Sequence, residues 1–567
     1  MFFYSFFNNL ENSKCDIIKC ILLPKGGKNM DNWWKRGVVY QIYPRSFKDS
    51  NDDGIGDLNG IISKLDYLKD LGINIIWLSP VYRSPNADNG YDISDYYSIQ
   101  PNFGTMDDMD KLLEEAKRRD IKIVMDLVIN HTSDAHEWFQ KSRNKIEPYT
   151  DYYIWKSGEK DKLPNNWTSF FAEDCWEFDE VRQEFYLHLF DKRQPDLNYR
   201  NKKVLEEIKK VMTFWLEKGV AGFRCDVINV IFKSSLENGK KKMILTGSEH
   251  YLSQEGTHTI LKELREDVLS KYDCFTVGET VFVTPKMGKD LCDKERKELD
   301  MIFSFEHMEV DQYIVKWFKR KFSAKRFGKV ISKWQNNLEW AANYFENHDQ
   351  PRSVSRFGDD KKYWDKSAKL LATMLISLKG TPFIYQGQEI GMTNFDYTSL
   401  EEIEDVESHN VYKMAKKLKI PAWYRWKMMK KGSRDNARTP YQWNDKNNAG
   451  FSNGKPWLKV NKNYKDINLE KQINDKNSIY SFYKNLLSLR NSNETLIYGD
   501  FKSIKNSKKC IIYDRSYKNK RYRIFLNFSN KTIKENIDGV VILSNYENRI
   551  NRNELRPFEA VIVKIEV

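Results

Sequence analysis

Short apolar runs alternate with amphipathic stretches along the chain from Val38 onward. The runs VVYQIYP, INIIWLSP and IKIVMDLVIN are apolar almost throughout, and segments 58–72 and 106–120 between them carry apolar residues at helical spacing. Strands without polar alternation are typical of a parallel sheet that is covered on both faces. The pattern therefore predicts a β-α-β-α-β unit over this part of the chain.

Five further runs of the same kind follow, namely AGFRCDVIN, CFTVGE, MIFSFEH, NYFENHD and TPFIYQGQEIG. Segment 204–216 also has apolar residues at helical spacing, and it fits as the helix between the third and fourth strands. Eight parallel strands with intervening helices favour a closed barrel over an open sheet. We therefore predict an α/β fold, a (β/α)8 TIM barrel.

Two segments depart from this alternation. Residues 132–200 are too long for a simple connection, and their tryptophans could equally be core residues or platforms for a sugar: Trp138, Trp155, Trp167 and Trp176. After a predicted helix over 479–490, segments such as RYRIFLNFS indicate an antiparallel β domain. We expect an N-terminal extension (1–29), a catalytic barrel (30–131 and 201–494), an inserted subdomain (132–200) and a C-terminal antiparallel β domain (495–567).

The composition is that of a soluble globular protein. Hydrophobic residues make up 40% and charged residues 31%, and no apolar run is long enough to cross a bilayer. The formal net charge is +13, but the 93 Lys and Arg are scattered among 80 Asp and Glu rather than gathered in one stripe. We therefore expect neither a nucleic-acid partner nor a membrane, and we interpret the densest basic run, Lys240 to Lys242, as solvated surface.

The cysteines and the N-terminus bear on the compartment. Seven cysteines are few for 567 residues, and they show neither metal spacing nor a disulfide framework, so a reducing cytoplasm fits best. Residues 1–29 lack the basic leader and the cleavage site of a secretory signal. We expect them to be a disordered extension, or the product of a start codon placed upstream of Met30, and we expect the chain to be a cytoplasmic monomer.

Several predicted strands end in polar residues that would be costly if they were simply buried. They follow the third, fourth, fifth and seventh strands: Asp126, Asn130, His131, Arg224, Asp226, Glu279, His348 and Asp349. In a barrel these strand ends converge on one face. A single buried carboxylate of this kind is often structural, paired with an arginine or a backbone turn, but the whole set indicates a functional site.

This set contains the groups that cleavage of a glycosidic bond requires. One carboxylic acid protonates the leaving oxygen, and a second carboxylate attacks or stabilises the anomeric carbon. One glutamate and two aspartates supply these parts. Arg224 lies two residues before Asp226 and therefore on the same strand face, so we expect its charge to lower the pKa of that aspartate and hold it ionised.

Four segments, DLVINH, GFRCDVIN, VGET and ENHD, resemble the signature segments of the α-amylase family of glycoside hydrolases. QPDLN at 194–198 resembles a fifth, and the resemblance runs from about Asn32 to the C-terminus. Within this family the chain is most similar to the oligo-1,6-glucosidase (isomaltase-like α-glucosidase) group, which shares YQIYPRSF, NGYDISDY and NARTPYQW-like segments.

The resemblance implies a retaining, exo-acting α-glucosidase that removes terminal α-1,6-linked glucose from isomaltose and short isomalto-oligosaccharides without an organic cofactor. It implies Asp226 as the nucleophile, Glu279 as the general acid/base and Asp349 as the stabiliser of the transition state. It also implies a subsite for the non-reducing glucose, lined by Asp88, Tyr91, His131, Arg224, His348 and Arg438. By its position alone, Arg438 would be taken for a surface residue.

Val227 follows the implied nucleophile, and its identity bears on which glycosidic linkage the enzyme would cleave. The resemblance implies a preference here, because in this family a valine at this position goes with α-1,6 linkages and a threonine with α-1,4 linkages. A β-branched apolar side chain reshapes the leaving-group side without offering a hydroxyl, which is consistent with such a role.

The loop from Asp49 to Asp57 alternates oxygen-bearing residues as a calcium loop does. Its candidate ligands are Asp49, Asn51, Asp53, Ile55 and Asp57. The twelfth position is Gly60 rather than the bidentate glutamate of an EF-hand, so the loop is not that motif. It resembles a calcium site of related glucosidases, which implies a structural Ca²⁺ far from the chemistry; a polar turn without metal is the alternative.

Other functions stay open at this point. Segment 232–264 lacks the Gly-Pro-Arg-Ile-His element of close relatives, and because this region helps to form the leaving-group side, the aglycone is undetermined. A trehalose-6-phosphate hydrolase could use Lys240 to Lys242 to contact phosphate, and sucrose or α-1,4-linked sugars are further candidate substrates. An isomerase is less favoured, because no arginine-rich aromatic motif follows Phe305. A non-catalytic scaffold of the kind that partners transporters is disfavoured, because the three acids are present and no membrane helix is predicted.

Overall fold

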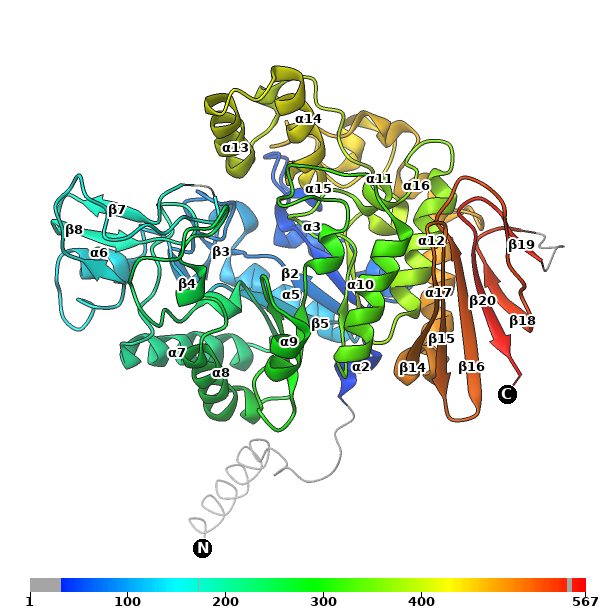
Figure 1. Cartoon of the computed structure of the whole chain (residues 1–567), viewed down its shortest axis with the longest axis horizontal. Coiled ribbons are helices and arrows are strands. Elements are labelled where there is room, and N and C mark those ends of the chain that lie inside the picture. The colour runs from blue at the N-terminus through cyan, green and yellow to red at the C-terminus, as the bar shows by residue number, and fades with distance from the viewer. Residues whose placement is uncertain (1–31, 172, 548–552, 567) are drawn as a thin grey trace, which may run out of the picture.

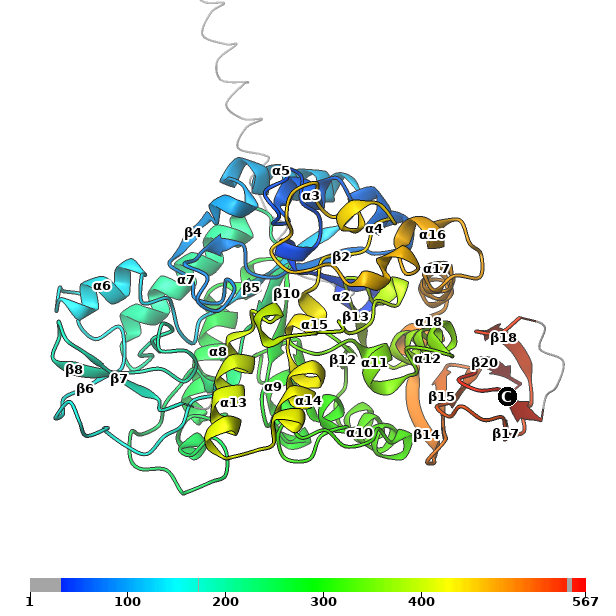
Figure 2. The ribbon, with the colours of Figure 1, turned by 90° about the horizontal axis from the view of Figure 1, so that it is seen from above.

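The computed structural model describes residues 32–171, 173–547 and 553–566. A central barrel lies between an inserted subdomain and a C-terminal sheet, which occupy opposite ends of the molecule in two perpendicular views (Figures 1 and 2). The predicted extension over residues 1–29 lies outside the described residues.

The barrel is one sheet of eight strands, in which all hydrogen-bonded neighbours are parallel. Across the sheet the strands are β11 (Met301–Phe303), β10 (Phe275–Glu279), β9 (Gly222–Cys225), β5 (Lys122–Leu127), β2 (Ile75–Leu78), β1 (Val39–Ile42), β13 (Thr381–Tyr385) and β12 (Ala342–Asn343). The two end strands, β11 and β12, contact each other. These are the eight apolar runs of the sequence, so the predicted (β/α)8 barrel is confirmed.

Amphipathic helices cover the outside of the barrel, and local capping sets their ends. The predicted helix over 58–72 is instead two helices, α3 (Leu58–Ile62) and α4 (Leu65–Leu71). The Ser63 hydroxyl donates to the Gly60 carbonyl at this break, a local bond that competes with a continuous helix. Further helices of the outer layer are α5 (Met106–Arg118), α7 (Lys202–Glu217), α8 (Glu255–Asp267), α9 (Pro285–Cys292), α10 (Ala324–Asn337), α12 (Trp364–Ser377) and α17 (Ile479–Asn491).

The insertion that follows β5 contains a helix and a small antiparallel sheet. These elements are α6 (Glu137–Arg143), β6 (Trp155–Lys156), β8 (Glu184–Leu187) and β7 (Trp176–Asp179). Trp138, Trp167 and Trp176 are buried, and the half-buried Trp155 stacks on Phe139. The four tryptophans are therefore core residues of the insertion rather than platforms for a sugar.

The C-terminal domain is a five-stranded antiparallel sheet, as predicted. Its order is β14 (Asp500–Asn506), β15 (Cys510–Tyr517), β16 (Lys520–Asn527), β20 (Ala560–Ile565) and β18 (Val540–Ser544). Two buried side chains of β15 join the sheet to α12. The Tyr513 hydroxyl lies 2.6 Å from the Ser377 hydroxyl, and the Arg515 guanidinium donates to the Ser377 carbonyl.

Two more helices, α13 (Val406–Lys417) and α14 (Ala422–Gly432), stand together at one edge of the barrel (Figure 1). They have their own apolar core, in which Val411 and Met429 pack with Trp317 of the loop after β11. The sequence analysis assigned this segment to the barrel without distinguishing it.

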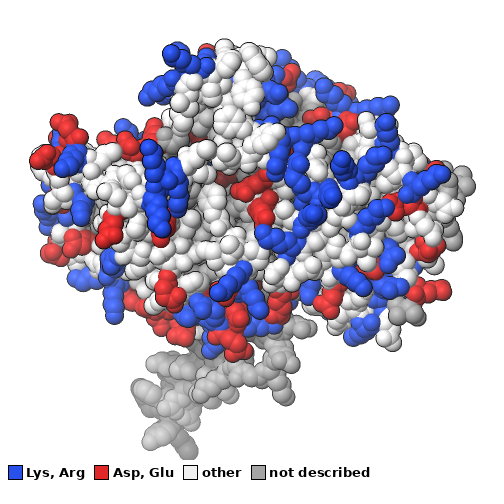
Figure 3. Space-filling view, in the orientation of Figure 1, with Lys and Arg blue, Asp and Glu red and all other residues white. Residues whose placement is uncertain are grey.

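The surface carries both signs of charge intermixed, without one basic stripe on the face in Figure 3. Within the described part of the chain, no helix combines the length and the apolar character needed to cross a bilayer. Five described cysteines are free thiols, namely Cys175, Cys225, Cys274, Cys292 and Cys510.

Candidate active site

A cavity of about 730 Å³ lies at the carboxyl ends of the barrel strands, and its size is typical of a small-molecule site. Seven of the predicted site residues line it: Asp88, Tyr91, His131, Asp226, Val227, Glu279 and Asp349. The other three, Arg224, His348 and Arg438, lie behind these residues and contact them. The fold therefore brings together all the residues that were predicted to act on glucose.

Arg224 on β9 is a cation shared by three carboxylates. Its Nη1 lies 2.5 Å from Asp126 Oδ1 and 2.6 Å from Asp226 Oδ1, while its Nη2 lies 2.6 Å from Glu279 Oε2. Asp126 is the register partner of Arg224 in the pairing of β5 with β9, and the guanidinium lies 5.3 Å from the centre of the Trp77 ring. The register of three neighbouring strands thus sets the geometry of this cluster.

Burial dominates the protonation of Asp226 and Asp126. It raises the pKa of Asp226 well above its ordinary value; Arg224 opposes this increase, but the Glu279 and Asp126 carboxylates add to it. Burial likewise raises the pKa of Asp126 to about 6, against the effect of Arg224. The prediction that Arg224 leaves Asp226 with a lowered pKa was therefore wrong, because one guanidinium divided among three carboxylates does not offset their lost hydration. Asp226 and Glu279 each lie 2.6 Å from a terminal nitrogen of the same guanidinium, so the two carboxyl groups face one part of the cavity.

Asp349 lies in the opposite electrostatic environment. Its Oδ1 is 2.6 Å from Arg438 Nη2 and 3.6 Å from Arg434 Nη1. Burial by itself raises the pKa of Asp349, but the charges of Arg434 and Arg438 outweigh burial and hold this pKa below its ordinary range. Asp349 is therefore ionised at neutral pH.

His348 is neutral and fixes the floor of the cavity. Burial lowers its pKa to about 3. The Gln41 amide nitrogen lies 2.8 Å from His348 Nδ1 and donates to it, which leaves the ring proton on Nε2, 2.7 Å from the Tyr91 hydroxyl. Tyr91 in turn donates to Asp126 Oδ2 at 3.2 Å. This chain of hydrogen bonds links the seventh barrel strand to the third.

Val227 has an unusual backbone conformation for a β-branched residue, with φ 36° and ψ 39°. Its N–H group donates to Glu279 Oε2 at 3.2 Å, and its side chain lines the cavity. The residue after Asp226 is therefore held in a strained turn between the two acids.

Arg434 is a site residue that the sequence analysis missed. It precedes the short helix α15 (Asp435–Arg438) and bridges three carboxylates, with Nη2 3.1 Å from Asp88 and Nε 2.7 Å from Asp405. Its third partner is Asp349, and Glu407 Oε2 lies farther away, 3.8 Å from Nε. No local motif marks this arginine, because its partners lie 346 and 29 residues away in the chain.

Arg438 was predicted from the resemblance alone, and it lies on α15, almost fully buried. Its Nε donates to the His348 carbonyl at 3.0 Å, so it supports both His348 and Asp349. Its Nη1 is buried and, within the described residues, has no hydrogen-bond partner.

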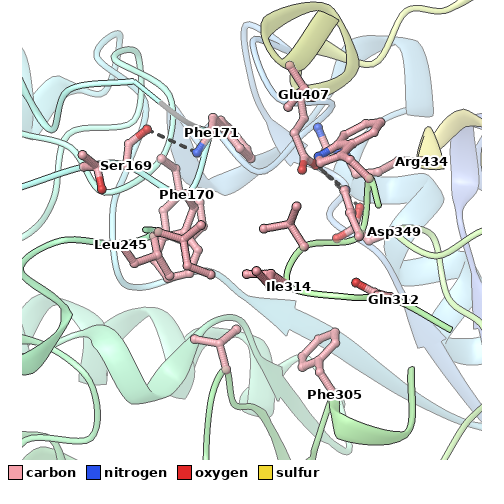
Figure 4. Close-up of a pocket in the computed structure, with 18 of the residues that line it drawn as sticks. Ser169, Phe170, Phe171, Leu245, Phe305, Gln312, Ile314, Asp349, Glu407 and Arg434 are labelled. Carbon is pink, nitrogen blue, oxygen red and sulfur yellow. Dashed lines mark hydrogen bonds and ion pairs between the residues drawn. The ribbon is translucent and has the colours of Figure 1, made fainter. Parts of the chain in front are cut away.

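Aromatic rings form part of the cavity wall and were also missed. Phe170, Phe171 and Phe190 come from the insertion, and Phe305 follows β11. In Figure 4, Phe170 and Leu245 lie across the cavity from Asp349 and Arg434. The Phe170–Phe171 pair in the insertion was the available signal, but buried and lining aromatics look alike in a sequence.

The Asp49–Asp57 loop lies apart from this site, and none of its residues lines the cavity. Asp49 accepts hydrogen bonds from three backbone N–H groups of the loop, and Asp57 accepts from the Ser50 hydroxyl and the Ser50 and Gly60 N–H groups. Over the described ranges, no three His, Cys, Asp or Glu side chains form a group that could hold a metal ion by themselves. The predicted ligand set here also uses the Asn51 side chain and the Ile55 carbonyl.

Comparison with known proteins agrees with this geometry. The profile of the alpha-amylase catalytic domain matches residues 41–499. An oligo-1,6-glucosidase of Parageobacillus thermoglucosidasius is 50% identical over 558 residues, which cover 94% of this chain and 99% of that protein.

Two crystal structures are also similar to this chain. Trehalose-6-phosphate hydrolase of Bacillus licheniformis has a TM-score of 0.89 at 42% identity, covering 94% of this chain and 99% of that one. Isomaltulose synthase of Klebsiella sp. LX3 has a TM-score of 0.92 at 39% identity, and the match covers 94% of this chain and 100% of that one.

Replacing Arg224 tests the shared cation. Arg224→Gln leaves three carboxylates facing one another, so we expect the free energy of unfolding to fall by about 3–5 kcal/mol at pH 8. The substitution also raises the pKa values of Asp126 and Asp226 further above their unfolded values. A carboxyl group whose pKa is raised by folding stabilises the folded state at low pH, and this stabilisation is lost as the pH rises through the folded pKa. Part of the decrease in the free energy of unfolding should therefore be recovered when the pH is lowered from 8 to 6. Denaturant unfolding at both pH values measures this.

Arg118→Gln is the control for this experiment, because Arg118 pairs with Glu114 and Glu115 on the surface of α5. Its substitution should change stability by less than about 1 kcal/mol at either pH. Parallel stability profiles of Arg224→Gln and the unaltered protein between pH 6 and pH 8 would contradict the role given to Arg224.

Proposed function

The chain belongs to the α-amylase family of glycoside hydrolases, and from this premise we propose that it is a retaining, exo-acting α-glucosidase that removes terminal α-1,6-linked glucose from isomaltose and short isomalto-oligosaccharides. The observation that carries the proposal is the pair Asp226 and Glu279, which are bound to one guanidinium at the ends of adjacent strands. The linkage is supported by the relative at 50% identity, which is named an oligo-1,6-glucosidase, and by Val227 beside the nucleophile.

In the proposed first step, Asp226 attacks the anomeric carbon while Glu279 gives its proton to the glycosidic oxygen. The bond from carbon to this oxygen breaks, a glucosyl ester forms on Asp226, and the aglycone leaves as a neutral alcohol. An inverting enzyme needs roughly 6.5–9.5 Å between its carboxyl groups for a water molecule. Asp226 and Glu279 each lie 2.6 Å from one guanidinium, which holds the two carboxyl groups together and supports the retaining mechanism. With the proton on Glu279, Asp226 is ionised for the attack.

In the second step, Glu279 takes a proton from water, and the resulting hydroxyl attacks the ester carbon. Glucose is released with the α configuration, because two displacements at one carbon restore the original geometry. The Val227 N–H bond to Glu279 Oε2 positions that carboxyl for both proton transfers.

Asp349 is the proposed stabiliser of the oxocarbenium-like transition state. Its lowered pKa keeps it anionic, so it can face the positive charge that develops on the sugar ring. The unpartnered Nη1 of Arg438 is available for a glucose hydroxyl, and Asp88, Tyr91 and His131 provide the other polar groups around the same ring. These groups close one end of the cavity, which supports removal of a terminal unit.

Trehalose-6-phosphate hydrolysis has less support as a second function. The lysines that were considered for phosphate binding, Lys240 to Lys242, are all described in the structure and do not line the cavity, whereas Met243 does. The Lys242 ammonium instead lies 2.7 Å from Glu249 Oε2 and 2.7 Å from the Ser248 hydroxyl.

A structural Ca²⁺ in the Asp49–Asp57 loop is a further proposal. The side chains of Asp49, Asn51, Asp53 and Asp57 and the Ile55 carbonyl would hold it. An all-oxygen donor set with three carboxylates suits this hard cation. The neighbouring Lys48 ammonium is directed to the carbonyls of Gly450 and Phe451, at 3.1 and 3.0 Å, so it does not occupy the place of the ion.

The few cysteines, free where they are described, support the proposal that the protein works in a reducing cytoplasm. A monomer is the simplest assembly consistent with a site built from one chain.

The role of the nucleophile is tested by Asp226→Gly. We expect kcat for isomaltose to fall by at least about 10³-fold, because the covalent intermediate can no longer form. Azide should restore turnover and give β-glucosyl azide, since it reaches the anomeric carbon from the face that Asp226 vacates. Proton NMR of the product identifies the anomer, and circular dichroism checks the fold.

Glu279→Gln is the matched comparison for the azide experiment. This variant keeps Asp226, so azide should attack the glucosyl ester and give α-glucosyl azide instead. An α-configured azide product from Asp226→Gly would mean that Asp226 is not the nucleophile.

The linkage is tested at Val227. The value of kcat/KM should be higher for isomaltose than for maltose. Val227→Thr should lower the isomaltose-to-maltose ratio of these values by roughly 10–200-fold, as expected for one hydroxyl or methyl contact beside the leaving group. Val281→Thr, the same change elsewhere on the cavity wall, is the control and should leave the ratio near its original value. If the unaltered enzyme prefers maltose or trehalose 6-phosphate, the α-1,6 proposal is wrong although the hydrolase assignment holds.

Calcium is tested by thermal unfolding in EDTA and in excess Ca²⁺. Binding to the folded state alone adds about 2.7 kcal/mol when the ion is present at 100 times its Kd, so Tm should be higher with calcium. Asp53→Asn should reduce this difference. Asp52→Asn, which alters the contact with Asn453 but no proposed ligand, should keep it. The same Tm of the unaltered protein in both buffers would exclude the ion.

A further inference from the structure

A basic segment runs from the loop after β11 into helix α10. Residues 316–329 contain seven Lys and Arg and no Asp or Glu. A run of charges is usually a solvated surface, and Lys321, Lys325 and Lys329 of this segment are exposed. Arg320 and Arg326 differ from these lysines, because both are half-buried.

The guanidinium groups of Arg320 and Arg326 converge on one backbone carbonyl. Arg320 Nε donates to the Val310 carbonyl at 3.1 Å, and Arg326 Nε donates to the same oxygen at 3.2 Å. Arg326 Nη2 also donates to the Lys321 carbonyl at 2.7 Å. The two cations are therefore held side by side, although like charges repel each other at such a distance.

No carboxylate neutralises this pair of cations. Within the described part of the chain, neither guanidinium forms an ion pair with an Asp or Glu side chain. Asp311 of the same loop is bound instead by the Arg356 guanidinium at 2.8 Å and by the Lys319 ammonium at 3.5 Å. Both terminal nitrogens of Arg320 and the Nη1 of Arg326 have no hydrogen-bond partner among the described residues, so they are available to a ligand.

The pKa values of two neighbouring groups reflect the same excess of positive charge. Burial and the charge of Arg356 lower the pKa of the Lys319 ammonium to about 7, against the opposite effect of Asp311. Burial and the charge of Arg320 likewise lower the pKa of Arg326 from its ordinary value. A bound anion would oppose both shifts, because a nearby negative charge favours the protonated form of a base.

We propose that Arg320 and Arg326 bind a phosphate group, carried by inorganic phosphate or by a small phosphorylated sugar. The planar guanidinium presents paired N–H groups that match the spacing of phosphate oxygens. A phosphate dianion also balances the charge of two guanidinium groups, whereas a carboxylate would balance only one of them.

A phosphate group at this position would fasten a loop of the active site to α10. Arg320 stands at the base of a hairpin, where its N–H group donates to the Asp311 carbonyl at 2.8 Å, while Arg326 belongs to α10. Gln312 and Ile314 of the same hairpin line the active-site cavity (Figure 4). An anion that binds both arginines would therefore restrain a loop that forms part of the cavity wall.

The binding of inorganic phosphate is measured by isothermal titration calorimetry at constant ionic strength, set with sodium chloride. We expect one site per chain. Arg320→Gln and Arg326→Gln should each weaken the binding by at least about tenfold, because each removes hydrogen bonds to a charged ligand. Phosphate should raise the Tm of the unaltered protein more than that of either variant. In phosphate-free buffer, the variants should keep the Tm of the unaltered protein, which shows that they are folded.

Hydrogen exchange measured by mass spectrometry tests the fastening of the loop. Phosphate should slow the exchange of backbone amides over residues 311–320 in the unaltered protein, because opening of the hairpin would then require the loss of the bound anion. The same amides should exchange at one rate with and without phosphate in Arg326→Gln.

Arg83→Gln is the matched control, because Arg83 is exposed and also forms no ion pair within the described ranges, but it stands alone. Its phosphate affinity should equal that of the unaltered protein. Glucose 6-phosphate distinguishes the two sources of the phosphate group. Tighter binding of this ester than of inorganic phosphate, lost in Arg320→Gln, assigns the site to a phosphorylated sugar, and weaker binding assigns it to the free ion.

Four results would overturn the proposal. Three of them concern binding: no heat of binding, an affinity that Arg320→Gln and Arg326→Gln both retain, or an affinity that Arg83→Gln reduces equally, as expected for general screening of a basic surface. Displacement of phosphate by glucose would place the anion in the active-site cavity instead. Binding that leaves the exchange over residues 311–320 unchanged would contradict the fastening of the loop.

Discussion

One buried cation holds the catalytic face together. The Arg224 guanidinium contacts Asp126, Asp226 and Glu279, and each of these carboxylates would be costly to bury without it. Because the guanidinium is planar and donates from both terminal nitrogens, it can bind acids from three adjacent strands at once, which the point charge of a lysine cannot do with the same geometry. The geometry of the site therefore depends on the register of β5, β9 and β10 as well as on the acids.

The same cavity contains carboxylates in two opposite environments. Around Arg224 the acids outnumber the cations and burial raises the pKa of Asp226, whereas around Asp349 the arginines Arg434 and Arg438 hold its pKa low. Pairs of acids whose environments push their pKa values apart can take different roles at one pH. The proposed roles of Asp226 as the nucleophile and of Asp349 as a permanent anion are consistent with this difference in the number of neighbouring cations.

The sequence was sufficient to predict the barrel and the floor of the site, because both depend on local features. Each strand is an apolar run, and Asp226, Glu279 and Asp349 stand at the ends of such runs. Arg434 could not be found in this way, since its partner Asp88 is 346 residues distant and no pattern joins the two. The pKa of Asp226 was predicted with the wrong sign, because a sequence shows the nearby Arg224 but not the burial that outweighs it. The break between α3 and α4 was missed, because apolar spacing continues across it while one serine hydroxyl bonds the backbone.

The buried floor of the cavity and its exposed lining residues also differ in how much a substitution costs. At the floor, every charged group is buried against another, so removing one leaves an unpaired charge and costs several kcal/mol. Met243, Ile314 and Leu418 also line the cavity but are exposed on loops, where most substitutions change stability by less than about 0.5 kcal/mol. The barrel therefore fixes the reaction, and the loops are free to change the aglycone. A chain of this fold can therefore keep Arg224 and its acids while the exposed residues that line the cavity change.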